Sequence, residues 1–143
     1  MLKNKRLISI ISFVLLIIMS ALCFTSCGMG LDKDKANDDI IEFLRAVRND
    51  DFKGAKQYLH PSFEDDIESF FSEVEEQLDI DLQSGITILG YFGSYYAAYT
   101  SDVDGSLYER YLEIEVSGKV YDLIVTVVEN DEGYGIDRIE IEY

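Results

Sequence analysis

The spacing of apolar residues along the chain changes at Gly85. Before this glycine, apolar residues recur every three or four positions, and after it they recur at every second position. A repeat of 3.6 residues is that of a helix with one buried face, and a repeat of two is that of a strand. The chain therefore places its helices first and its strands afterwards. This order is typical of an α+β domain and excludes one in which strands and helices alternate.

Three helices are predicted before Gly85. The first covers residues 37–48, with Asn37 as its N-cap. The second covers residues 52–59 and ends at His60-Pro61, because the residue before a proline avoids helical geometry. Ser62 then caps the third helix. The apolar stripe of the third helix comprises Phe63, Ile67, Phe70, Phe71, Val74 and Leu78.

Four strands are predicted after Gly85. They cover residues 86–99, 107–116 and 120–129, and a last segment that carries Ile139, Ile141 and Tyr143. Gly90 and Gly93 lie inside the first strand and indicate a bulge or bend there. Short turns separate the strands, so the sheet is an antiparallel meander. We expect residues 36–143 to form one α+β domain, in which three helices pack on one face of a curved four-stranded sheet.

The N-terminus has the parts of a secretory signal peptide. Lys3, Lys5 and Arg6 precede an uncharged apolar run over residues 7–24, and small residues follow it. The run is also just long enough to cross a bilayer, so an uncleaved membrane helix is the alternative.

The end of this run, Phe24-Thr25-Ser26-Cys27, resembles the lipobox of bacterial lipoproteins, although Phe24 stands where a leucine is usual. The resemblance implies that residues 1–26 are removed as a signal peptide and that Cys27 becomes the lipid-bearing N-terminus. Residues 27–35 would then be a short linker. The expected location is a bacterial cell membrane, with the domain facing away from the cytoplasm.

The two cysteines, Cys23 and Cys27, offer little other chemistry. A disulfide between them would need an oxidising compartment. A zinc site would need more Cys or His ligands, and His60 is the only histidine. We expect the domain to need no disulfide, metal or cofactor.

The part of the chain after residue 26 is strongly acidic. It contains all 28 Asp and Glu but only nine of the twelve Lys and Arg, which gives a net charge of −19. Nucleic acid is a poor partner for such a domain because its phosphates bind basic surfaces. Anionic lipid is likewise repelled, so attachment to the membrane has to come from the lipid on Cys27.

Residues 43–63 read FLRAVRNDDFKGAKQYLHPSF. This pattern of a helix, an acidic break, an aromatic residue and Tyr-Leu-x-Pro resembles the opening of nuclear transport factor 2-like and cystatin-like domains. Small bacterial lipoproteins of that class have the same plan of helices and strands. The resemblance implies one of two functions. The domain is a non-enzymatic binding or protein-interaction module, or it is an enzyme of the ketosteroid isomerase and dehydratase type with a pocket between helices and sheet.

No catalytic constellation is evident in the sequence, which favours the binding module. His60 is interpreted as a helix stop, and the segment Asp102-x-Asp104-Gly105 as a turn, since it lacks the spacing of a calcium loop. Arg110 and Asp122 are the polar exceptions among the inward positions of the sheet. Because the sequence shows neither a catalytic constellation nor a metal motif, no catalytic and no metal-binding residue is predicted.

Tyrosines mark the one candidate interaction surface. Tyr91, Tyr95 and Tyr99 are predicted on one face of the first strand, with Tyr111 beside them on the second. The inward face is assigned to Phe92 and Tyr96, among others. The tyrosines either pack across strands or form a recognition surface for an unknown protein or small ligand, because tyrosine is enriched at interfaces.

Overall fold

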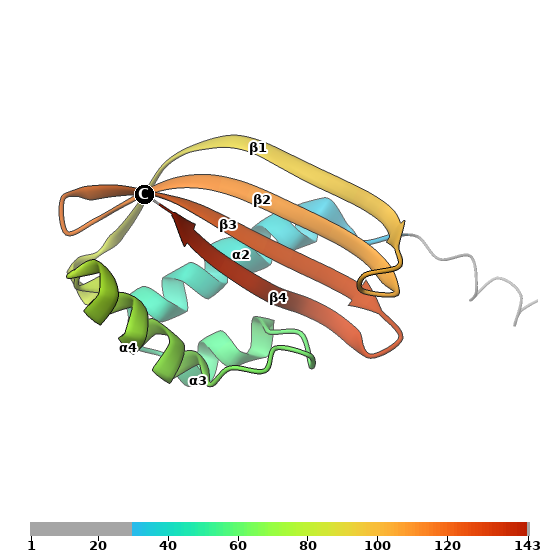
Figure 1. Cartoon of the computed structure of the whole chain (residues 1–143), viewed down its shortest axis with the longest axis horizontal. Coiled ribbons are helices and arrows are strands. Elements are labelled where there is room, and N and C mark those ends of the chain that lie inside the picture. The colour runs from blue at the N-terminus through green and yellow to red at the C-terminus, as the bar shows by residue number, and fades with distance from the viewer. Residues whose placement is uncertain (1–29, 143) are drawn as a thin grey trace, which may run out of the picture.

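The computed structural model describes residues 30–142. Within this range the chain forms the predicted α+β domain, with helices first and a four-stranded antiparallel sheet after them (Figure 1). The helical elements are α2 (Lys33–Arg48), α3 (Phe52–Ala55), η1 (Lys56–Tyr58), α4 (Ile67–Leu78) and η2 (Leu82–Ser84). The strands are β1 (Ile86–Thr100), β2 (Gly105–Val116), β3 (Lys119–Asn130) and β4 (Gly133–Glu142). The predicted signal peptide and Cys27 lie outside the described residues.

The first helix starts earlier than predicted. Asp32 is its N-cap, and the Asp32 carboxylate accepts the backbone N–H groups of Asp34 and Lys35. The predicted cap, Asn37, lies inside α2 and its side-chain oxygen accepts the hydroxyl of Tyr108 at 3.0 Å. The prediction of Asn37 as a cap is therefore wrong. The residue instead joins α2 to the sheet.

The second and third helices are shorter than predicted. The segment after residue 51 is one turn of α-helix followed by a 3₁₀ turn. The third helix is capped by Asp66, whose carboxylate accepts the N–H of Ser69, and not by Ser62. Ser62 is engaged elsewhere, because its hydroxyl contacts the carboxylate of Asp137.

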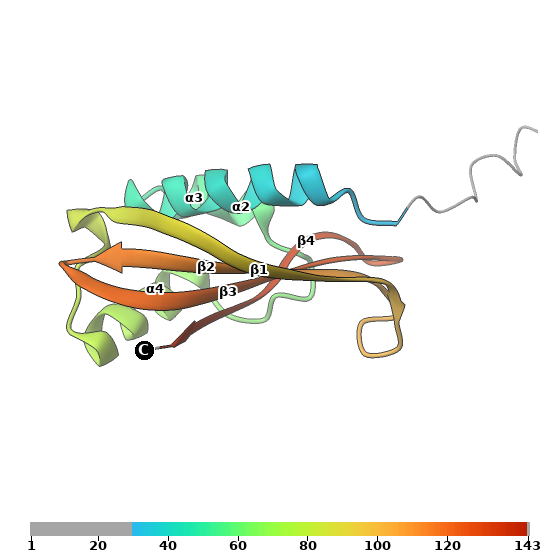
Figure 2. The same ribbon diagram turned by 90° about the horizontal axis from the view of Figure 1, so that it is seen from above.

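The strands follow one another in the sheet in the order β1-β2-β3-β4, as predicted. Ser117 and Gly118 join β2 to β3 with φ values of +53° and +75°, which is the conformation that a two-residue hairpin favours. The helix α2 runs along one side of the sheet (Figure 2). β1 and β4 are the two edges (Figure 1).

The hydrophobic core fills the space between the helices and the inner face of β2, β3 and β4. Phe43 of α2 and Phe71 of α4 meet there, with ring centroids 6.1 Å apart. Leu112 and Val125 supply the sheet side and are fully buried. β1 contributes less, because none of its fifteen residues is buried.

Candidate functional site

Exposed apolar side chains gather on one strand. Within residues 30–142, seven large apolar side chains are exposed, and six of them belong to β1. These six are Leu89, Tyr91, Phe92, Tyr95, Tyr96 and Tyr99. The seventh, Val120, lies at the start of β3. An apolar cluster of this kind on a folded domain usually marks an interaction site.

Irregularities in β1 divide its aromatic side chains between the two faces of the sheet. The register with β2 shifts between Ile88 and Gly90 and again between Tyr91 and Gly93. Tyr91 consequently pairs with the buried Leu112 and lies on the face that the helices cover. Tyr95 pairs with Glu109, on the opposite, open face. The predicted single stripe of tyrosines is therefore wrong for Tyr91.

Phe92 is also on a different face from the one predicted. Its ring packs against the ring of Tyr111, with centroids 6.0 Å apart, and 58% of the residue is exposed. The cause is the first irregularity, before Gly90, where one extra residue turns the following side chains over; the second irregularity, after Tyr91, turns them back. The prediction for Tyr96 is confirmed, since it pairs with the buried Tyr108. The open face thus presents Phe92, Tyr95 and Tyr111 together.

The hydroxyls of two tyrosines donate to neighbouring carboxylates. The Tyr111 hydroxyl lies 2.7 Å from a carboxylate oxygen of Glu109, and that of Tyr99 lies 2.7 Å from Asp104. These hydrogen bonds raise the pKa of both tyrosines, because a phenol beside a carboxylate resists ionisation. Asp104 belongs to the turn after β1, as predicted, with φ of +49°. We call Phe92, Tyr95, Tyr99 and Tyr111 the aromatic surface.

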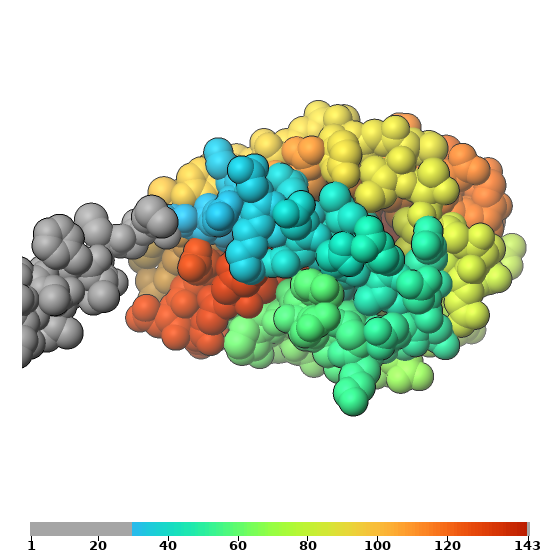
Figure 3. All heavy atoms as spheres, turned by 180° about the vertical axis from the view of Figure 1, so that it is seen from behind, coloured from blue at the N-terminus to red at the C-terminus, as the bar shows by residue number. Residues whose placement is uncertain are grey.

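A groove lies between α2 and β1. It has a volume of about 330 Å³ and is visible as a hollow beside α2 (Figure 3). Apolar side chains from both elements line it, together with two arginines of α2. The lining residues are Ile41, Leu44, Arg45, Arg48, Ile86, Thr87 and Ile88. Arg45 is paired with Glu42 on its own helix.

Arg110 is an unusual cation on the helix-covered face of the sheet. It pairs with the buried Val125 of β3, and its guanidinium lies 4.3 Å from the centre of the Tyr91 ring. The Nε atom is buried and has no hydrogen-bond partner among the described residues. Stacking on an aromatic ring is an interaction that arginine makes well. Asp122, the other predicted exception, pairs with Glu113 and faces the open side.

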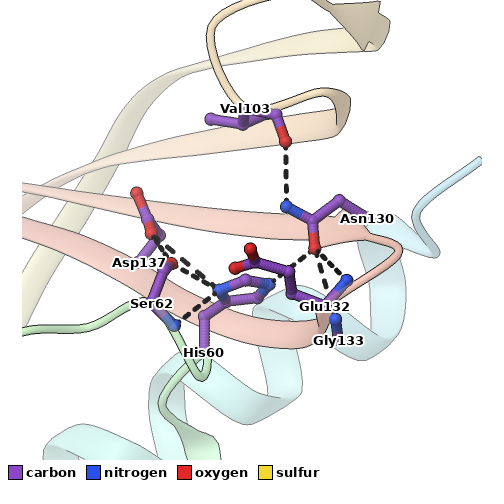
Figure 4. Close-up of polar contacts among 7 residues, drawn as sticks. All are labelled: His60, Ser62, Val103, Asn130, Glu132, Gly133 and Asp137. Carbon is purple, nitrogen blue, oxygen red and sulfur yellow. Dashed lines mark hydrogen bonds and ion pairs between the residues drawn. The ribbon is translucent and has the colours of Figure 1, made fainter.

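His60 is buried in a polar network at the edge of the sheet (Figure 4). Its Nδ1 lies 2.5 Å from the Ser62 hydroxyl, and its Nε2 lies 3.1 Å from Oδ1 of Asn130. The same Oδ1 accepts the backbone N–H groups of Glu132 and Gly133. Because this oxygen only accepts, the proton of that contact has to be on Nε2 of His60.

The network suits a structural role better than a catalytic one. The Ser62 hydroxyl lies between His60 and the carboxylate of Asp137, and a carboxylate beside a serine oxygen opposes its ionisation. The backbone N–H of His60 also donates to the carbonyl of Ile136 at 2.8 Å. The network therefore joins the turn before α4 to β4 and to the turn between β3 and β4.

The sequence contained a signal for the altered strand faces but not for the His60 network. Gly90 and Gly93 indicated a bend in β1, and each lies next to a register shift. The partners of His60 are 70 or more residues away, apart from Ser62, and no local pattern relates them.

Residues 30–142 hold no group of three or more His, Cys, Asp or Glu placed to bind a metal ion. Over the same residues, no helix has the length and apolar character needed to cross a membrane. Comparison of the chain with protein-family models, with characterised proteins and with solved structures finds no match.

Proposed function

We propose that this chain is a bacterial lipoprotein, anchored through Cys27 on the outer side of the cell membrane, whose domain is a non-enzymatic protein-interaction module. The lipobox-like segment Phe24-Thr25-Ser26-Cys27 supports the anchor. The aromatic surface supports the interaction, and it is the observation that carries this function. The plan of three helices and a four-stranded meander agrees with the resemblance to nuclear transport factor 2-like and cystatin-like domains.

The chemistry of the aromatic surface indicates the kind of partner. Tyrosine and phenylalanine bury large areas and lose little conformational freedom, so they are common at interfaces. Here 54% of Tyr95 and 58% of Phe92 are exposed. Glu109 and Glu113 flank them on the same face of the sheet. A suitable partner presents an apolar patch bordered by basic side chains.

The length of the tether keeps this surface near the membrane. The cap of α2, Asp32, is five residues after Cys27, and five residues extend over at most about 20 Å. The net charge of −19 after residue 26 disfavours contact with anionic lipid. The domain would therefore lie close to the bilayer without adhering to it, and its partner would lie at the same short distance from the membrane surface.

The alternative is a small-molecule enzyme that uses a pocket between helices and sheet. The groove between α2 and β1 is the feature that favours it. Enzymes of the ketosteroid isomerase type need acid–base side chains in that pocket. The residues that line this groove include two arginines but no carboxylate or imidazole. We favour the interaction module for this reason.

The anchor and the interaction are tested separately. Metabolic labelling with palmitate should mark the wild-type chain, while Cys27→Ser should leave an unlabelled precursor. Equal labelling of both would refute the anchor.

For the interaction, membranes carrying wild type, Tyr95→Ala or Val120→Ala are cross-linked and analysed by quantitative mass spectrometry. Val120 is the matched control, since it is 51% exposed and lies outside β1. We expect a partner that Tyr95→Ala loses and Val120→Ala retains. A set of partners that Tyr95→Ala leaves unchanged would exclude the aromatic surface.

A further inference from the structure

A row of carboxylates crosses the open face of the sheet. Glu113 of β2 is directly opposite Asp122 of β3, and Asp122 is directly opposite Glu142 of β4. All three are exposed, and none forms an ion pair with a lysine or arginine of residues 30–142. Like charges directly opposite one another in a sheet are destabilising. We call these three residues the carboxylate row, and it is an unfavourable arrangement in the free domain.

An apolar row lies beside the carboxylate row on the same face. Tyr111 of β2 is directly opposite Ile124 of β3, and the ring of Phe92 packs against the ring of Tyr111. Tyr111 and Ile124 are each two positions along their strand from a member of the carboxylate row. Residues two apart in a strand share a face and lie about 6.6–7 Å from each other. The open face thus presents an apolar row and an acidic row side by side, and both rows run across the strands.

We propose that the open face binds a basic amphipathic helix of a partner protein. The apolar side of this helix lies on the aromatic surface and on Ile124, and its lysine or arginine side chains lie on the carboxylate row. The inference rests on the proposed function, because it names the chemistry and the form of the partner at the same surface. In Figure 1 the sheet lies in front of α2, so that view looks onto the open face.

The geometry of the open face favours a helix over an extended segment. The backbone groups of β2 and β3 are bonded to neighbouring strands on both sides, so the face offers none of them to a bound chain. A segment buried there has to satisfy its own backbone hydrogen bonds, and a helix does so internally. Neighbouring strands lie about 4.8 Å apart, and successive turns of a helix rise by about 5.4 Å. Cationic side chains on three successive turns therefore match the spacing of the carboxylate row.

Charge complementarity selects a basic helix over a neutral or an acidic one. Asp122 is at the centre of the carboxylate row, with a carboxylate directly opposite on each neighbouring strand. A lysine or arginine placed over Asp122 is close to both neighbours and reduces their mutual repulsion. The acidic net charge of the chain also attracts a basic segment and repels an acidic one. Asp122 therefore lowers the stability of the free domain and contributes to binding.

The test uses the full chain in nanodiscs of phosphatidylcholine and, as the probe, a synthetic helical peptide of leucine and lysine. Binding of the labelled peptide is measured by fluorescence anisotropy at about 150 mM salt, which screens long-range attraction, and the signal of empty discs is subtracted. Asp122→Asn is compared with Asp65→Asn, because both residues are exposed and each variant removes one negative charge. We expect Asp122→Asn to weaken binding several-fold and Asp65→Asn to leave it within about twofold of wild type.

A stability measurement separates this role of Asp122 from a structural one. Asp122→Asn should raise the urea midpoint of the full chain, because it removes the repulsion between facing carboxylates. Asp65→Asn should leave the midpoint unchanged. Weaker binding together with higher stability is expected of a residue that is kept for its partner. An Asp122→Asn midpoint no higher than that of wild type would mean that the carboxylate row carries no repulsion, and it would overturn the proposal.

The binding data can also overturn the proposal. They do so if the wild-type chain does not bind the peptide, if the two variants weaken binding equally, or if a peptide with glutamate in place of lysine binds as well. Equal weakening would assign the binding to net charge and not to the open face. The proposed function fails separately, when Tyr95→Ala retains every cross-linked partner in membranes. A partner that Tyr95→Ala loses and Asp122→Asn retains supports the proposed function and excludes the basic helix.

Discussion

The Nε2 atom of His60 lies 3.1 Å from Oδ1 of Asn130, a residue 70 positions later in the chain. This contact connects the only histidine to the turn between β3 and β4. Asn130 extends the connection, because its amide nitrogen donates to the carbonyl of Val103 at 2.8 Å. Three separate segments are thus held together around one buried ring (Figure 4).

Replacing His60 should therefore destabilise the domain. His60→Ala removes a 2%-exposed side chain and leaves buried polar partners unsatisfied. We expect a loss of about 2–4 kcal/mol in the free energy of unfolding, measured by urea denaturation. The exposed Ser94→Ala serves as the control and should stay within about 0.5 kcal/mol of wild type. Equal urea midpoints for the two variants would show that the His60 network contributes nothing to the stability of the domain.

Gly135 should tolerate no side chain. A Cβ atom at this position would lie 2.5 Å from the backbone nitrogen of His60 and from the carbonyl carbon of Leu59. Backbone atoms cannot move away as a flexible side chain can, so Gly135→Ala should cost about 3 kcal/mol. Gly90→Ala is the matched control, since no atom lies within 4 Å of a Cβ built there. Thermal unfolding of both variants checks the difference, and a similar midpoint would contradict the close approach.

The faces of β1 can be tested by stability alone. Phe92→Ala should cost less than about 1 kcal/mol, because more than half of the residue is exposed. Leu112→Ala should cost about 2–5 kcal/mol, because Leu112 is fully buried in the core. If Phe92→Ala lowered the free energy of unfolding as much as Leu112→Ala does, the ring of Phe92 would be buried, as simple alternation along the strand had predicted.

The predicted and observed elements show which parts of the fold the sequence determines locally. The change of hydrophobic period at Gly85 was sufficient to predict that helices precede strands, because the period reflects the one buried face of each element. The helix starts were less certain from sequence. Asn37 and Ser62 are residue types that cap helices as well as Asp32 and Asp66 do. In the folded chain, however, the side chain of Asn37 bonds to Tyr108 and that of Ser62 to Asp137, so neither caps a helix.

The candidate site was predicted only in part. The tyrosines of β1 are exposed as expected, but strict alternation fails once a strand contains a bulge. Each extra residue reverses the side-chain direction of those that follow, so Tyr91 and Tyr95 are on opposite faces despite their even spacing. The contacts of Arg110 and His60 depend on tertiary structure, and no spacing in the sequence indicates them.

The start of α4 should respond to acid through Asp66. A hydrogen bond from Lys56 is the largest cause that lowers the pKa of this carboxyl, and the backbone N–H of Ser69 adds to it. The charged carboxylate is thus favoured in the folded state. Its contribution to stability is present above the unfolded pKa of about 3.9 and is lost as the pH falls through the lower, folded value.

Removing the lysine tests this cause directly. Lys56→Met should raise the pKa of Asp66 toward its ordinary value, so that the capping interaction is lost at a higher pH than in wild type. A carbon-detected NMR titration of the Asp66 carboxyl between about pH 2 and 6 measures the shift. Lys53→Met is the control, since Lys53 carries the same charge in the preceding turn of helix but does not bond to Asp66. If both variants titrate as wild type does, the lysine is not the cause. If the pKa of Asp66 rises equally in both variants, the net positive charge nearby and not the hydrogen bond from Lys56 sets that pKa.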